Sequence, residues 1–381
     1  MGSSVAWMVM AAALMQVSGP PRGFAQELNY QKEVFRLWWE AELETRADLL
    51  PESGSVPDFR IPYCGHDYPD RGGGTIAALR KYDLAFHGGR PLASEWERRD
   101  VRGHRGMLDP ERPVLFPRLR EALLAGRVPS WYGHCNGWTA AAIRHAEPQR
   151  SVVRNGVVFT PADIKGLLAE IYMYTDSEFL GGNDAVIHPA IFHLSITNWI
   201  GRGEHPIGME TAIGQVVINY PVYAYKSTVT KPSPNTREVK MTVTYAVNTP
   251  REYDKGPRLS RNMYFHYLLD LDSEGHIIGG RYYSDSNRID MLWAPLKPVQ
   301  GGQPGNERGN PYVDVREVLA IWRESVPEEI RKKWLNIDPT DEDRVLPESS
   351  QEPPPTSDAA AAQPHSDNAA GSVDTSSPDQ P

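Results

Sequence analysis

The sequence predicts an α+β fold, in which a helical N-terminal part is followed by antiparallel strands. Apolar residues recur at helical spacing in the first part of the chain, for example across residues 27–50. After Gly201 the chain becomes rich in Val, Tyr and Thr, which favour strands. This order of elements argues against a doubly wound parallel sheet. With 381 residues, 40% of them hydrophobic, the chain can bury a full core.

The two ends of the chain differ from the part between them. Residues 1–25 contain an apolar run from Val5 to Val17 that fits a signal peptide ending at Ala25 and is too short to span a bilayer. An uncleaved N-terminal anchor is the alternative. Residues 347–381 lack Leu, Ile, Phe, Tyr and Trp, which predicts a disordered tail. We therefore expect a secreted or periplasmic protein without stable membrane insertion.

Between the ends we expect two regions, a helical one at 26–129 and a second one at 130–340 that carries the candidate chemistry. A propeptide is an alternative interpretation of part of the first region. The net charge of −9 and the absence of basic runs interleaved with aromatics predict no nucleic-acid partner.

Each helix expected in the first part follows from a local pattern. Residues 27–50 place Val34, Leu37, Trp38 and Ala41 on one face of an amphipathic helix. Residues 117–125 predict a second helix, which ends before Gly126. Between them, the loop at 51–74 contains side chains that could bind a metal, although strong zinc signatures need two such pairs. They are Cys64, His66, Asp67 and Asp70.

The central segment predicts a helix, a hairpin and a second helix. Alanine-rich residues 139–146 favour a helix that Pro148 ends. Asn155 and Gly156 between two Val-rich arms indicate a two-residue hairpin turn. Thr160 then predicts an N-cap, with a proline at the first helical position and an aspartate at the third.

The second half predicts strands and one final helix. Residues 216–230 and 237–247 have strand composition, and residues 264–284 read as two strands around a turn at 272–275. Residues 313–326 predict the last helix, before the C-terminal tail.

Cys135 is the candidate nucleophile, because it stands where the predicted helix begins. A helix N-terminus favours the thiolate, and its free backbone N–H groups, here of Asn136 and Gly137, can stabilise an oxyanion. Trp131 and Trp138 are candidate apolar walls of a substrate cleft. The alternative is a structural disulfide between Cys135 and Cys64, the two cysteines of the chain, in a non-catalytic secreted binding protein.

A nucleophilic thiol also needs a base and an orienting acid. His193 with Glu210 could supply imidazole and carboxylate from two neighbouring segments, whereas His134 is expected to point away and His145 lies too far along the helix. Motifs for serine hydrolases, zinc proteases and nucleotide-binding loops are absent from the sequence.

Five blocks in order along the chain resemble the transglutaminase elicitor family, known from plant-pathogenic oomycetes and also from bacteria. They span residues 130–293 and begin with the block around Cys135. The blocks are WYGHCNGWTAAA, NGVVFTPADIKGLLAEIY, PAIFHLSITNWIG, VINYPVYAYK and GHIIGGRYYSDSNRIDMLW. The succession of blocks is far more specific than any one of them.

The resemblance implies a distantly papain-like cysteine acyltransferase that transfers a protein glutamine side chain to a lysine amine. Cys135 matches the family nucleophile, His193 resembles a family histidine, and Glu210 stands where an aspartate is expected. Asp163, Asp176 and Asp184 are alternatives for the acid. The implied partners are proteins with accessible glutamine and lysine. A cysteine peptidase, amidase or deamidase would need the same thiol and base.

The resemblance has two limits. The block detected by plants, VWNQPV, reads VINYPV here, with Ile218 and Tyr220 in place of Trp and Gln, so plant recognition is not implied. No cofactor is expected, and calcium dependence, common among transglutaminases, has no matching acidic loop.

Overall fold

The computed structural model describes residues 23–104, 127–182, 186–214, 216–334 and 336–346. Most of the predicted signal peptide, the predicted helix at 117–125 and the predicted tail lie outside the described residues. Within the described part, no helix is both long enough and apolar enough to cross a membrane.

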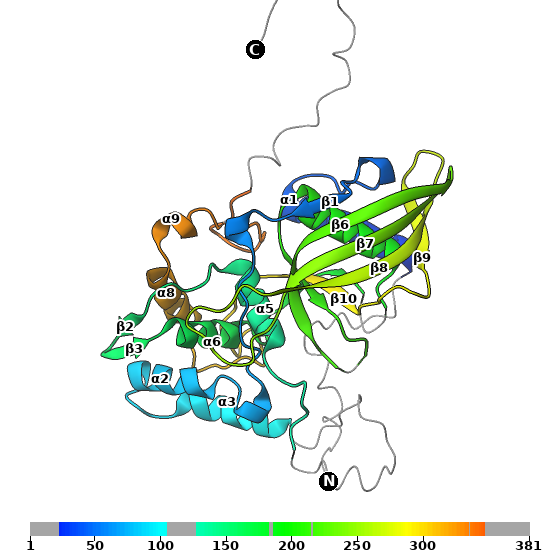
Figure 1. Ribbon diagram of the computed structural model, residues 1–381. Helices are drawn as coiled ribbons and strands as arrows, with labels where there is room; N and C mark the ends of the chain where they lie inside the picture. The colour runs from blue at the N-terminus through cyan, green and yellow to red at the C-terminus, as the bar shows by residue number, and fades with distance from the viewer. Residues whose placement is uncertain (1–22, 105–126, 183–185, 215, 335, 347–381) are drawn as a thin grey trace, which may run out of the picture.

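An eight-stranded antiparallel sheet forms the centre of the fold (Figure 1). Its order is β4-β10-β5-β6-β7-β8-β9, with the short β1 paired beside β6. The strands are β1 (Ser53–Ser55), β4 (Ser177–Gly181), β5 (Ile207–Glu210), β6 (Asn219–Ser233), β7 (Thr236–Ala246), β8 (Ser260–Leu271), β9 (Ile277–Tyr282) and β10 (Met291–Pro295). A separate hairpin joins β2 (Val152–Arg154) to β3 (Val157–Phe159). Because β10 lies between β4 and β5, the sheet brings together segments far apart in the sequence.

Helices cover both faces of this sheet. They are α1 (Phe24–Trp39), α2 (Ile76–Phe86), α3 (Leu92–Gly103), α5 (Cys135–Arg144), α6 (Pro161–Tyr172), α7 (Pro189–Ile196), α8 (Val315–Ser325) and α9 (Glu328–Arg331). A π-helical turn, Thr197–Arg202, continues α7. Helix α5 packs against β5, β6 and β10, and α7 packs against β4, β8 and β9.

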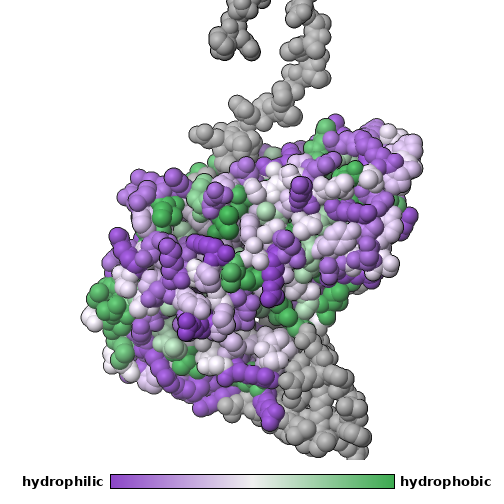
Figure 2. All heavy atoms as spheres, in the orientation of Figure 1, coloured by the Kyte–Doolittle hydropathy of each residue, from purple (hydrophilic) through white to green (hydrophobic). Residues whose placement is uncertain are grey.

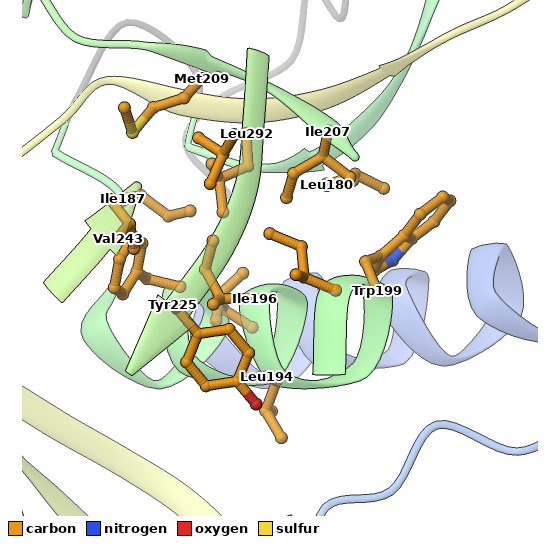
Figure 3. Close-up of a cluster of buried hydrophobic side chains, with 14 of the residues drawn as sticks. Leu180, Ile187, Leu194, Ile196, Trp199, Ile207, Met209, Tyr225, Val243 and Leu292 are labelled. Carbon is orange, nitrogen blue, oxygen red and sulfur yellow. The ribbon is translucent and has the colours of Figure 1, made fainter. Parts of the chain in front are cut away.

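The strands divide their side chains between two cores because alternate residues point to opposite faces. Leu180, Met209 and Leu292 belong to a core with α1 and α7, whereas their neighbours Phe179 and Trp293 belong to a core with α5, α6 and α8. Figure 3 shows part of the first core, in which side chains of the sheet and of α7 meet in a mainly apolar cluster. We call these the α7 face and the α5 face of the sheet.

Several local predictions are confirmed. Strands β2 and β3 pair around Asn155 and Gly156, which both adopt the positive φ that such a turn needs. Helix α6 begins with a capping box, in which Thr160 and Asp163 bond each other's backbone N–H groups. Strands appear at the predicted places after Gly201, so the α+β prediction is also confirmed.

The helix predicted at 27–50 has different limits. Helix α1 begins at Phe24 and ends at Trp39, where Glu40 adopts a left-handed conformation. Leu37 is 55% exposed rather than buried, and Ala41 lies beyond the helix. The predicted cleavage site after Ala25 falls within the first turn of α1.

The described N-terminal residues pack into the same cores as the rest of the chain. Helix α1 contributes Trp38 to the α7 face, and α2 contributes Leu79 to the α5 face. Both cores of the described chain therefore contain residues from either side of the predicted boundary at residue 129.

The visible surface is mainly hydrophilic, with hydrophobic residues in small separate groups (Figure 2).

Candidate functional site

Cys135 is the first residue of α5, as the sequence predicts. The first intrahelical bond runs from the N–H of Trp138 to the carbonyl of His134, at 2.9 Å. The N–H groups of Asn136 and Gly137 precede that bond, so the helix leaves them free of i−4 partners. These are the donors predicted for an oxyanion, and they lie beside a half-buried thiol.

Asn219 is the main hydrogen-bond partner of the Cys135 sulfur. Its backbone N–H donates to Sγ at 3.4 Å, and its side-chain amide Nδ2 lies 3.8 Å from Sγ. The thiol in turn donates to the carbonyl of Val217 at 3.6 Å. The indole N–H of Trp293 donates to Asn219 Oδ1 at 2.8 Å, which orients the amide nitrogen toward the sulfur. Sequence reasoning did not single out Asn219, although it lies in the VINYPV block.

The resting thiol is protonated. Burial raises the pKa of the Cys135 thiol to about 11, because it outweighs the two donors from Asn219, and the carboxylates of Glu210 and Asp67 add smaller contributions in the same direction. This raised pKa runs against the expectation that the helix N-terminus keeps the group as a thiolate. A proton acceptor has to act when the sulfur attacks.

A loop from Tyr63 to Asp70 holds the turn that precedes Cys135. The N–H of His134 donates to the carbonyl of Asp67 at 2.7 Å, and the N–H of Asp70 donates to Tyr132 at 3.0 Å. A Cβ atom on Gly133 would lie 2.7 Å from that same Asp67 carbonyl oxygen, so glycine permits the close approach. The loop thus fixes the position of the thiol.

The residues around the oxyanion donors are tightly packed. The side chain of Asn136 donates to the carbonyl of Met173 at 2.7 Å, which leaves only its backbone N–H for an oxyanion. A Cβ atom on Gly137 would lie 2.2 Å from the carbonyl oxygen of Ala169 in α6. Glycine at 137 therefore allows α5 and α6 to touch behind the site.

The two predicted wall tryptophans have different environments. Trp138 is 2% exposed, and its indole N–H donates to the carbonyl of Tyr63 at 3.2 Å. It is a core residue that supports the loop, so the prediction that it lines a cleft is wrong. Trp131 is half-buried beside Tyr132, with ring centroids 4.8 Å apart, and remains a candidate wall.

Glu210 lies on the same face of the sheet as Cys135. It is the last residue of β5 and pairs with Asn219 across the β5–β6 ladder. Its neighbour Met209 points into the core of the α7 face, so Glu210 points to the α5 face. Glu210 is 4% exposed, and its carboxylate is one of the charges that raise the thiol pKa.

The structure does not bring His193 to the thiol. His193 lies on α7, buried on the opposite face of the sheet, and its Nδ1 shares a 2.8 Å hydrogen bond with the hydroxyl of Tyr267. Burial lowers the pKa of His193 to about 3, so the imidazole is neutral. Its assignment as the base of Cys135 is corrected, because the sheet stands between them. An all-apolar segment gives no signal of the face on which its histidine will lie.

The alternative acids are also accounted for, except Asp184, which lies outside the described residues. Asp163 accepts the Thr160 N–H at 2.7 Å and a bond from Lys81, in the cap of α6. Asp176 lies before β4, and burial raises its pKa. Neither is among the charges that most affect the Cys135 thiol.

A cluster of buried ionisable groups lies behind the site. Asp70, Glu97 and His134 offer three atoms within 4.8 Å of one another, which could hold a metal ion. Burial alone would lower the pKa of His134, but Glu97 and Glu170 outweigh it and raise that pKa to about 10. The resulting imidazolium compensates the carboxyl groups within the described cluster. Of the four metal-binding candidates in the loop at 51–74, only Asp70 belongs to this cluster, and Cys64 does not.

Both cysteines are free thiols in the structure. Cys64 is buried, and its Sγ accepts from the N–H of Leu259 at 3.2 Å and donates to the carbonyl of the same residue at 3.0 Å. The predicted alternative of a Cys64–Cys135 disulfide is therefore wrong. The hypothesis of a non-catalytic binding protein depended on that disulfide and is no longer supported by it.

The chain is similar to a known protein family and to a solved structure. Residues 119–249 match the family model described as transglutaminase elicitor, which covers about a third of the chain. The fold is similar to the crystal structure of the GP42 transglutaminase from Phytophthora sojae, with a TM-score of 0.62 and 23% sequence identity. That similarity covers 78% of this chain and 98% of the other. No curated protein matches the chain.

Proposed function

We propose that this protein is an exported protein-glutamine γ-glutamyltransferase, because residues 119–249 match the transglutaminase elicitor family model and the fold is similar to that of the GP42 transglutaminase. The observation that supports it most is the position of Cys135, at the first residue of α5 with two donors of Asn219 on its sulfur. A thiol at a helix start, next to unused N–H groups, is suited to acyl transfer.

The proposed reaction has two halves. The Cys135 sulfur attacks the carboxamide carbon of a glutamine side chain and loses its proton, and the C–N bond breaks to release ammonia. The N–H groups of Asn136 and Gly137 stabilise the oxyanion formed between these events. In the second half a primary amine attacks the thioester, loses a proton and displaces the sulfur, which regains its own.

The proposed substrates are proteins with accessible glutamine and lysine side chains. Export is proposed from the N-terminal sequence pattern, and the region from 130 to 340 is proposed to carry the chemistry. If water took the place of the amine, the enzyme would be a deamidase or amidase. The type of reaction therefore depends on which acceptor reaches the thioester.

The experiment measures incorporation of a labelled primary amine into a glutamine-bearing protein, with ammonia release followed in parallel. Cys135→Ser is expected to lose both signals, whereas Cys64→Ser, which changes the other thiol of the described chain, is expected to keep them. Incorporation retained by Cys135→Ser would refute the proposal. Ammonia released without incorporation would replace the transferase by a hydrolase that uses the same thiol.

A further inference from the structure

The hydrogen bonds around Cys135 leave the identity of its proton acceptor as the open question of the site. Within the described chain, the atoms bonded to its sulfur come from Val217 and Asn219, and neither residue is a base. His134 is bound to Glu170, and His145 bonds the hydroxyl of Tyr172 at 2.6 Å. The two imidazoles nearest in sequence are therefore engaged elsewhere.

Glu210 is the buried carboxyl group that the sheet directs toward the thiol. The β5–β6 ladder sets Glu210 opposite Asn219, the residue whose N–H contacts Sγ. Directly opposed residues of an antiparallel pair have Cβ atoms about 4.5–5.5 Å apart. Helix α5 packs against both strands, so one side of the ladder presents Glu210 and Asn219 to the start of that helix.

We propose that the carboxylate of Glu210, set opposite Asn219 across the β5–β6 ladder, accepts the thiol proton of Cys135 when the sulfur attacks, in the role that an imidazole has in most cysteine acyltransferases. The inference rests on the function proposed above and adds the residue that moves the proton. Asn219 is then a positioning residue, because its two N–H donors stabilise the sulfur anion that forms and Trp293 fixes its amide.

The proton balance of this step is closed within the site. As the S–C bond forms, the S–H bond breaks, its proton moves to Glu210, and the carbonyl electron pair moves to oxygen. When the oxyanion collapses, the C–N bond breaks and the Glu210 proton leaves with the amide nitrogen as ammonia. In the second half Glu210 takes the proton of the attacking amine, and the departing sulfur regains it.

Two carboxylates act on the Cys135 thiol. Glu210 acts from the end of β5, and Asp67 acts from the loop at 63–70. The backbone N–H of Asp290 donates to the carbonyl of Glu210 at 3.1 Å, before β10 begins. With a second carboxylate near the thiol, a neutral S–H group is the resting state, and general-base transfer is required for attack.

Glu210→Gln tests the inference, with Glu178→Gln as a matched loss of a sheet carboxyl. Glu178 lies on β4 and bonds Tyr30 and Trp38 of α1. We expect Glu210→Gln to lower amine incorporation about 10²- to 10⁴-fold, the usual contribution of a general base. Glu178→Gln is expected to stay within about threefold of the wild-type rate, well below that contribution.

Two further measurements distinguish a proton acceptor from a structural group. The rate of alkylation by iodoacetamide as a function of pH reports the pKa of Cys135, and it should shift downward in Glu210→Gln because a negative charge is removed. Added formate should restore part of the activity of Glu210→Ala by supplying a carboxylate. Circular dichroism checks that each variant folds. If a Glu210 variant unfolds, Glu210→Asp takes its place, and we expect intermediate activity for it.

Wild-type incorporation by Glu210→Gln would overturn the inference, as would a loss in Glu178→Gln equal to that of Glu210→Gln. These results leave the proposed function intact if Cys135→Ser is still inactive. Failure of the function itself appears separately, as activity retained by Cys135→Ser.

Discussion

The two faces of the central sheet use the same strands for different purposes. On the α7 face, Leu180, Met209 and Leu292 pack with helix side chains in a cluster that is mainly apolar, as Figure 3 shows. On the α5 face, the same strands present Glu210 and Asn219 to a helix that begins with a thiol. Alternation along each strand therefore separates a face that stabilises the fold from one that carries the candidate chemistry.

Each face also contains a histidine, and the two differ in charge. His193 on the α7 face is desolvated without a charged partner, so its pKa is lowered to about 3. His134, the neighbour of Cys135 in the chain, lies 3.3 Å from Glu170 in the buried cluster behind the site, and its pKa is raised to about 10. Burial alone does not decide the state of an imidazole, because nearby carboxylates can reverse its effect.

His193→Ala should have the largest effect on stability and little effect on chemistry. Removal of a buried ring and its bond to Tyr267 leaves a cavity, so we expect a loss of about 2–4 kcal/mol in the free energy of unfolding. Urea denaturation measures that loss, and the turnover number of the folded variant should remain close to the wild-type value. A drop in turnover comparable to that of Cys135→Ser would mean that the two faces are not functionally separate.

Asn219→Ala should show the opposite pattern, with a smaller effect. The substitution removes the side-chain amide near Sγ but keeps the backbone donor, so we expect a roughly 10- to 100-fold lower rate of amine incorporation. Trp293→Phe, which only releases the amide, should lower the rate less. If Asn219→Ala reacts at the wild-type rate, the contact of this residue with the sulfur has no catalytic role.

The smallest predicted effect, counted per pH unit, is a pH dependence of stability with opposite signs for the two histidines. The unfolded pKa of both is near 6.5. His193 has a lowered pKa in the folded state, so it costs stability as pH falls from about 6.5 toward 3. His134 has a raised pKa, so its contribution is complete below about 6.5 and is lost as pH rises toward 10.

Unfolding free energies of wild type, His193→Ala and His134→Gln between pH 5 and 9 measure this difference. Each group contributes a slope of at most about 1.4 kcal/mol per pH unit. His193→Ala should flatten the acid side of the curve, and His134→Gln the alkaline side. Curves that stay parallel to that of the wild type on both sides would contradict the assigned charges.

Local signals in the sequence predicted a large part of the fold. The capping box of α6, the Asn155–Gly156 turn and the β-rich second half depend on residues close together in the chain. The start of α5 at Cys135 also follows from neighbouring residues. Such features need no knowledge of the tertiary structure.

The partners of Cys135 could not be predicted in the same way. The sheet inserts β10 between β4 and β5, so Trp293 reaches Asn219 from 74 residues away. The segment around His193 is apolar on every side, and its pattern does not reveal which face of the sheet it covers. Trp138 was predicted to line a cleft because the residue that it contacts, Tyr63, is also distant in sequence. The local pattern therefore did not show that Trp138 is a core residue.

The most direct test of the account is the mass of the protein after brief mixing with a short glutamine peptide and acid quenching. We predict an adduct equal to the peptide minus ammonia, located on Cys135 by peptide mapping and lost on treatment with hydroxylamine, as a thioester should be. An adduct on another residue, or amine incorporation that proceeds without any thioester on Cys135, would contradict the account.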